Sequence, residues 1–136
     1  MLKKIHIETL LISNTENGED IIRTQSTGGC LIEETGIMLR YAEKQNNGTA
    51  TLLLTEDLAD LKRHGSTEAR MTFVSGKLIP CTYKTANGML DFSLYTHQQS
   101  FDIDATGGCF KAQYSMLAAG KQVADNVLTV KWTFDE

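Results

Sequence analysis

Apolar and polar side chains alternate through most of this chain, and that period of two constrains its fold more than any other feature. The clearest run is 128–134, where Leu, Val, Trp and Phe occupy every second position. Such spacing sends successive side chains to opposite faces of a pleated strand. The same alternation recurs at 37–41, 50–54, 71–73, 79–85, 90–96, 101–105 and 110–116. The pattern predicts about ten short strands and an all-β fold.

Three Asn-Gly dipeptides, at 17–18, 47–48 and 87–88, are typical of turns that need a positive φ. Only the dipeptide at 87–88 is flanked closely by strand patterns on both sides. There we expect a two-residue hairpin between 83–86 and 89–95, whereas longer loops are expected around Asn17 and Asn47. The order of strands and turns favours an antiparallel meander.

Segment 56–63 is the one stretch with some helical character, because Leu58 and Leu61 are three positions apart. It stands between strands with almost no room for connections, so we favour a strand with a short turn there. A sheet of many short strands must protect its edges, and closure removes them. We therefore expect residues 1–136 to form one closed or nearly closed meander barrel of about eight to ten strands.

The tetrapeptide Thr-Gly-Gly-Cys occurs twice, at 27–30 and 106–109. Paired glycines let the backbone adopt unusual conformations and approach other groups closely. A phosphate-binding loop would need a Gly-Lys-Ser/Thr ending and a following helix, and neither is present. We therefore interpret each repeat as a barrel corner or a β-bulge.

Composition excludes several classes of function. The net charge is −4, and the basic residues are spread along the chain in runs no longer than two, so we predict no nucleic-acid partner. No stretch approaches the roughly 20 apolar residues that span a membrane, and the first residues read as a strand and not as a signal peptide. The expectation is a cytoplasmic protein with no membrane partner.

The three cysteines, Cys30, Cys81 and Cys109, form no Cys-x-x-Cys pair. Zinc sites need three or four convergent ligands and commonly show close pairs. Buried, reduced thiols are the favoured interpretation. We predict no metal and no cofactor.

The sequence gives no catalytic residue. His6, His64 and His97 lie far apart, and no Gly-x-Ser-x-Gly elbow accompanies them. A Ser/His/Asp set assembled in space stays open as an alternative, because such sets are recognised by geometry and not by order.

One set of polar and aromatic side chains is expected to point into the barrel. Glu43 shares the phase of 37–41, and Arg63 shares that of Leu61. The full set of tentative ligand-binding residues is Arg63, Glu43, Tyr41, Tyr83, Thr85, Tyr114 and Trp132. A charge inside a barrel is costly unless it is paired. Either Glu43 and Arg63 sit at strand ends, with Arg63 reaching solvent or packing on Trp132, or they line a cavity that holds a ligand.

Several local motifs, in order along the chain, resemble the YwiB-like family of small bacterial proteins. They are Tyr41-Ala42-Glu43, the LKRHG run at 61–65, MTFVSGK at 71–77, YKTANG at 83–88, and Gly107-Gly108 followed by Tyr114-Ser115-Met116. The resemblance implies a calycin-like, lipocalin-like barrel and a domain of unknown function. It implies no catalytic residues. The Gly-x-Trp of lipocalin first strands is absent, so carriage of a lipid does not follow.

Three hypotheses remain. The first is a barrel that binds a small molecule, anionic or apolar, in its interior or mouth. The second is a protein-interaction or structural barrel with a fully packed core and no ligand. The third is an enzyme that pairs Glu43 with Tyr83 or His64 as acid and base. Each is compatible with a monomer or a homodimer.

Overall fold

The computed structural model describes residues 2–135 and shows a closed barrel of ten antiparallel strands. Each strand pairs with its neighbours in the chain, and β1 pairs with β10 to close the barrel. This confirms the predicted all-β meander barrel. The elements are β1 (Leu2–Thr15), β2 (Gly18–Glu33), β3 (Gly36–Glu43), a 3-10 helix η1 (Lys44–Asn46), β4 (Gly48–Leu54), β5 (Ala59–His64), β6 (Glu68–Phe73), β7 (Leu78–Thr85), β8 (Gly88–Ile103), β9 (Gly107–Ala118) and β10 (Lys121–Phe134).

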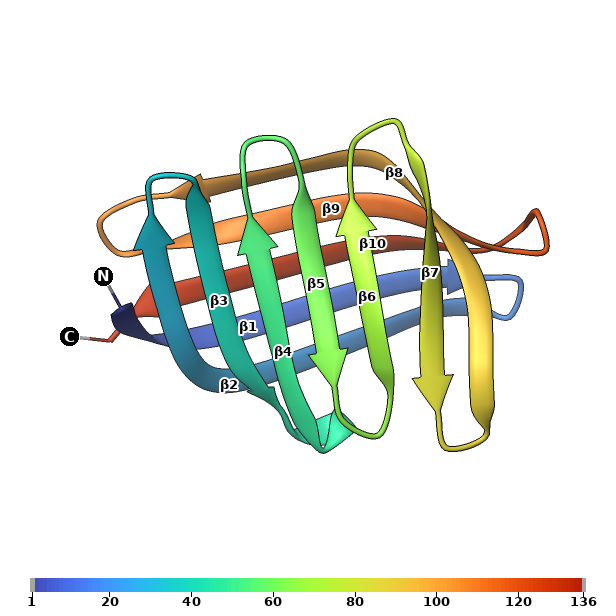
Figure 1. Ribbon diagram of the computed structural model, residues 1–136, viewed down its shortest axis with the longest axis horizontal. Coiled ribbons are helices and arrows are strands. Elements are labelled where there is room, and N and C mark those ends of the chain that lie inside the picture. The colour runs from blue at the N-terminus through green and yellow to red at the C-terminus, as the bar shows by residue number, and fades with distance from the viewer. Residues whose placement is uncertain (1, 136) are drawn as a thin grey trace.

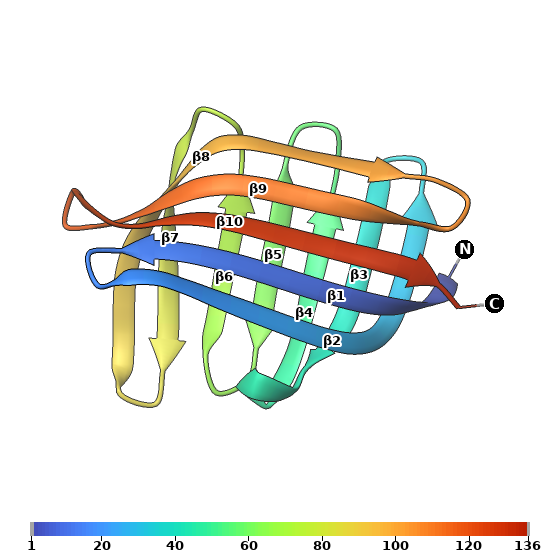
Figure 2. The same cartoon turned by 180° about the vertical axis from the view of Figure 1, so that it is seen from behind.

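The barrel is flattened into two layers whose strands cross (Figure 1). The short strands β3 to β7 form one layer, and the long strands β1, β9 and β10 form the other. Two strands, β2 and β8, belong to both layers because each bends partway along its length. Seen from behind, β1 and β10 run side by side across the middle of the long-strand layer (Figure 2).

The bend in β2 coincides with the first Thr-Gly-Gly-Cys. Residues 18–31 of β2 pair with β1, but pairing with β3 begins only at Gly28, opposite Tyr41. A Cβ at Gly28 would lie 2.1 Å from the carbonyl oxygen of Arg40, so only glycine lets β3 come this close. The ladder shows no register shift here. The first repeat is therefore a corner and not a bulge.

The bend in β8 has a different cause. The β8–β9 register shifts between Thr96 and Gln98, which leaves His97 as the extra residue of a bulge. The second Thr-Gly-Gly-Cys lies elsewhere, at the start of β9, where a Cβ at Gly108 would lie 2.2 Å from the Trp132 ring. The two repeats are therefore not equivalent corners. The first bends a strand, and the second makes room for the indole.

Two hairpin turns are built alike. Thr15 pairs with Gly18, and Thr85 pairs with Gly88, so each loop contains two residues. In both turns the threonine hydroxyl accepts a hydrogen bond from the asparagine N–H, at 3.1 Å from Asn17 and at 3.2 Å from Asn87. The hairpin expected at 87–88 is present with its loop one residue earlier. The longer loop expected at Asn17 is wrong, because the Thr-x-Asn-Gly turn there is equally tight.

Segment 59–64 is strand β5, as its position between strands predicted.

The shortest ladder of the barrel joins β6 to β7 and contains only two residue pairs, Glu68 with Lys84 and Ala69 with Tyr83. Pro80, which has no N–H to donate, lies in β7 beyond the end of that ladder.

The core fills the space between the layers. Its largest fully buried side chains are Trp132, Phe73, Phe110, Ile5, Ile7, Leu39, Leu52, Leu54, Leu94 and Val130. Phe73 contacts both Phe110 and Tyr114, with ring centroids 5.9 and 5.0 Å apart. The inward phases predicted for β3, β4, β9 and β10 are the buried ones.

Gly28→Ala tests the corner. The added methyl group overlaps the Arg40 carbonyl, so we expect the substitution to lower the free energy of unfolding by about 1–3 kcal/mol. Gly29→Ala is the matched control, because its Cβ would meet the flexible Leu2 side chain at 3.3 Å and the Lys3 carbonyl oxygen at an ordinary contact distance of 3.9 Å. This substitution should change stability by less than about 1 kcal/mol. Urea unfolding measures both. Equal effects of the two substitutions would contradict the corner role of Gly28.

Candidate functional site

A cavity of about 220 Å³ lies between the two layers, beneath the first half of β2. It is lined by Thr9, Leu11, Ile22, Thr24, Tyr41, Glu43, Gln45, Leu61, Arg63, Met71, Tyr83, Tyr114, Asn126 and Leu128. Ile22 is 50% exposed and marks the mouth, whereas Tyr41 and Tyr114 are buried at the back. Because β2 pairs with β3 only from Gly28 onward, the barrel wall is open at this point.

An ion pair stands in the cavity wall. The Arg63 Nε donates to both carboxylate oxygens of Glu43, at 3.1 and 3.2 Å. Glu43 ends β3 and Arg63 lies near the end of β5, and their side chains are 10% and 24% exposed. Both residues thus lie at strand ends, and Arg63 contacts Glu43 and not Trp132. A pair this sheltered is costly to break, because removing one partner leaves a desolvated charge.

Asn46 fixes the position of Glu43 from below. Its side chain bridges the β5–β6 turn, donating to the Thr67 carbonyl and accepting from the Thr67 N–H at 2.8 Å each. Its Nδ2 also lies 3.5 Å from Glu43 Oε1. Gly48 and Gly65 allow the two segments this close approach, since a Cβ at Gly48 would lie 1.6 Å from the His64 carbonyl oxygen. The carboxylate is therefore held on a rigid support.

Three tyrosines line the same cavity, and burial raises the pKa of each above its ordinary value. For Tyr41, the Glu43 carboxylate adds to the effect of burial on the pKa. For Tyr83 and Tyr114, burial is again the first cause of the raised pKa. The three phenols therefore keep their protons at neutral pH and act as hydrogen-bond donors. Tyr83 directs its hydroxyl to the Met71 sulfur at 3.5 Å.

Four further polar residues, Thr9, Thr24, Gln45 and Asn126, complete the lining. The Asn126 side chain hydrogen-bonds the Tyr114 hydroxyl, while its Oδ1 is buried without a hydrogen-bond partner among residues 2–135. Across the cavity wall, the hydroxyls of Thr9 and Thr24 contact each other. An unpaired buried acceptor is uncommon in folded proteins and calls for a partner.

The structure brings together five of the seven residues expected to bind a ligand: Tyr41, Glu43, Arg63, Tyr83 and Tyr114. It leaves two apart. Thr85 closes the β7–β8 turn, where its hydroxyl donates to the Gly88 carbonyl at 2.9 Å. Trp132 is fully buried against Gly108. Neither lines the cavity.

Sequence reasoning missed the other lining residues, although some carry a signal. Thr9 continues the inward phase of Ile5 and Ile7, and Asn126 has the phase of Leu128. A search for polar residues on inward phases identifies both. Gln45 lies in η1, where no strand phase applies, and the sequence offers no comparable signal for it.

A Ser/His/Asp cluster does assemble in space, but not in the order of a catalytic triad. Ser115 Oγ donates to Asp125 Oδ1 at 2.5 Å and lies 2.7 Å from His97 Nε2. The serine thus stands between the other two, whereas a nucleophilic serine needs the histidine in the middle. Ser115 is also buried, at 3% exposure. The cluster ties the β8 bulge to β9 and β10.

The acid–base pairs expected for an enzyme do not form among residues 2–135. His64 Nδ1 lies 3.6 Å from the exposed Glu68, and the Glu43 carboxylate is paired with Arg63. In the same range, no three His, Cys, Asp or Glu side chains converge to hold a metal ion. Burial raises the pKa of the Cys81 thiol to about 11, which keeps it protonated. No helix in the described part of the chain is long and apolar enough to cross a membrane.

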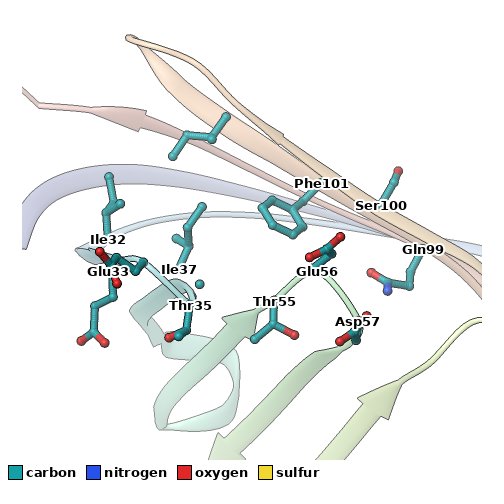
Figure 3. A pocket seen from close by; sticks show the side chains of 13 residues that line it. Ile32, Glu33, Thr35, Ile37, Thr55, Glu56, Asp57, Gln99, Ser100 and Phe101 are labelled. Carbon is teal, nitrogen blue, oxygen red and sulfur yellow. The ribbon is translucent and has the colours of Figure 1, made fainter.

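A second concavity, a groove of about 840 Å³, lies outside the barrel at the β2–β3 and β4–β5 turns. In Figure 3, Phe101 of β8 lies above Thr55 and Glu56 of the β4–β5 turn, and Ile37 lies to its left, above Thr35. Glu33, Glu34, Glu56 and Asp57 form its rim, and no Lys or Arg lines it. We refer to it as the acidic groove. The sequence analysis did not identify it, because it joins turns that are far apart in the chain.

A family model described as a domain of unknown function, DUF1934, matches residues 5–130. The chain belongs to the DUF1934 family. This agrees with the resemblance seen in its sequence motifs, and the family description assigns no activity. The match includes every residue that lines the cavity.

The fold of this DUF1934 chain is similar to a solved structure described as the crystal structure of ywiB protein from Bacillus subtilis. The TM-score is 0.88, the sequence identity is 18%, and the match covers 99% of this chain and 94% of that one. At this identity the likeness establishes the shared barrel fold. No curated protein matches the sequence.

The raised tyrosine pKa values predict an alkaline loss of stability. Above the ordinary tyrosine pKa near 10, the unfolded chain releases phenolic protons that the folded chain retains, so stability falls as pH rises. Tyr41→Phe should make the fall shallower by up to about 1.4 kcal/mol per pH unit. Urea unfolding between pH 8 and 12 measures the slope. An unchanged slope in Tyr41→Phe would contradict the burial of an un-ionised Tyr41.

Proposed function

We propose that this barrel binds a small molecule in the cavity beneath β2. The observation that carries the proposal is convergence: the buried tyrosines of β3 and β9 and the half-buried tyrosine of β7 meet an ion pair from β3 and β5 around one open space. Elsewhere the interior is filled by large apolar side chains. Barrels of this size either fill their interior or hold one small ligand, and the cavity favours the second outcome.

The size of the cavity limits the ligand. At about 220 Å³ it is smaller than the roughly 300–1,000 Å³ of drug-sized sites, so a compact metabolite suits it better than a lipid chain. Leu11, Leu61 and Leu128 supply apolar wall, while Tyr41 and Arg63 supply polar groups that fix orientation. This mixture is typical of small-molecule sites.

The setting we propose is a reducing one. Cys30, Cys81 and Cys109 are all free thiols, and the first two are buried. Free thiols persist most readily in the cytoplasm, where we propose that the protein acts without metal, cofactor or nucleic acid, as a monomer or a homodimer.

The second candidate function is protein interaction through the acidic groove. Ile32, Ile37 and Phe101 give the groove apolar lining beneath its acidic rim. Residues 99–103 of β8 pair with β9 on one side and have no strand partner in β7 on the other. The partner that fits is an extended, positively charged segment of another protein, since strand addition and charge complementarity both favour it. The interior cavity argues against the fully packed core that this hypothesis originally assumed.

Ile22→Trp tests the small-molecule proposal. The indole should fill the mouth of the cavity at little cost to folding, because Ile22 is 50% exposed. We expect a fragment library screened by NMR to give hits that shift Tyr41 and Arg63 signals in the wild type, and at least tenfold weaker binding in Ile22→Trp.

Ile21→Trp is the matched control. Ile21 is 52% exposed on the same strand but does not line the cavity. The Ile21→Trp variant should therefore bind the fragments as tightly as the wild type does. The proposal is wrong if no fragment shifts cavity signals, or if both tryptophan variants bind like the wild type.

Lysine substitutions test the groove. A labelled peptide of alternating lysine and valine should bind more weakly as salt rises, and Glu56→Lys combined with Asp57→Lys should weaken it about tenfold or more. Glu16→Lys with Glu19→Lys changes the net charge equally at the distant β1–β2 hairpin. Fluorescence anisotropy measures both. If both double variants lose the same affinity for the peptide, the effect comes from the overall charge of the protein, and the groove is not the binding site.

A further inference from the structure

The charge balance of the proposed binding site limits the class of ligand that it can hold. Glu43 and Arg63 are the only charged residues among the lining residues that the structure describes, and they neutralise each other. Glu43 is 8% exposed and accepts both hydrogen bonds from Arg63 Nε. A carboxylate that entered would lose its hydration next to a second carboxylate, with no net positive charge to offset the loss. The cavity therefore disfavours anions.

The cavity nevertheless presents donors. Within residues 2–135, no hydrogen bond engages the Tyr41 hydroxyl, although Tyr41 is 5% exposed and lines the space. The hydrogen bonds of Arg63 to described side chains leave from Nε, so its two terminal nitrogens remain able to donate. These groups need an acceptor on the ligand.

Asn126 also lines the cavity, but its Oδ1 is fully buried, so a ligand in the open space cannot reach that atom without a movement of the side chain. The recognition that these contacts support is therefore donation from Tyr41 and Arg63 to an acceptor on the ligand.

We propose that the ligand is uncharged and carries a strong hydrogen-bond acceptor, such as the carbonyl oxygen of a carboxamide or a lactam. Its acceptor meets Tyr41 and Arg63, and its remaining surface packs on Leu61 and Leu128. This inference rests on the proposed binding function and replaces the anionic ligand expected from Arg63 alone. The Glu43–Arg63 pair thus disfavours anionic ligands and also forms part of the cavity wall.

Matched amide and acid pairs test the inference directly. Benzamide and benzoate have nearly the same shape, as do nicotinamide and nicotinate, and differ in charge and in the N–H donor. We expect the amides to shift cavity signals in NMR titrations of the wild type at pH 7, with the acids at least tenfold weaker. Tyr41→Phe should weaken amide binding several-fold while leaving the acids unaffected.

Glu43→Gln reverses the selection. Without the carboxylate, Arg63 carries an unpaired charge into the cavity, so the acids should bind more tightly than the amides. Glu68→Gln is the control, because it removes an exposed carboxylate that pairs with His64 outside the cavity, and amide preference should persist.

The outcomes separate the two proposals. Wild-type binding of the acids as tight as that of the amides, or unchanged amide affinity in Tyr41→Phe, overturns the ligand class while the binding function stands. Failure of all four compounds to shift cavity signals also overturns the ligand class. The binding function itself is overturned only by the fragment screen with the Ile22 and Ile21 variants.

Discussion

Closure of this barrel depends on two strands that pass from one layer to the other. β2 makes the passage at Gly28, where the absence of a side chain lets the Arg40 carbonyl approach, and β8 makes it at the His97 bulge. The first bend depends on the missing side chain of Gly28, and the second depends on the extra residue of a bulge in one strand. Without either bend, the crossed layers would remain separate sheets with exposed edges.

The same bends create the cavity. Because β2 joins β3 only after its corner, its first half pairs on one side alone and leaves an opening between the layers. The ends of β3 and β5 carry Glu43 and Arg63 to this opening, and Asn46 fixes them against the β5–β6 turn. Architecture thus places a polar site where the barrel cannot be filled by its own apolar side chains.

Alternation was enough to predict the strands and the closed meander, because a residue's phase decides whether it points inward. It also predicted five of the residues that line the cavity. Tyr41, Glu43, Arg63, Tyr83 and Tyr114 were found this way. Phase does not give height along the barrel, so Thr85 and Trp132 share the inward phase but lie away from the cavity. Nor could it reveal the acidic groove or the pairing of Glu43, since both depend on turns that meet only in the folded chain.

The two-pair ladder between β6 and β7 makes this part of the barrel easier to open than the other strand pairings. Other neighbouring strands share longer ladders, so this seam needs the fewest broken hydrogen bonds to separate locally. Tyr83 belongs to the seam and also lines the cavity. Brief separation of β7 from β6 would widen the cavity without disturbing the Glu43–Arg63 pair on β3 and β5. The cavity therefore has one wall held by an ion pair and another wall bordered by the shortest ladder of the barrel, so local opening is expected to begin on the β7 side.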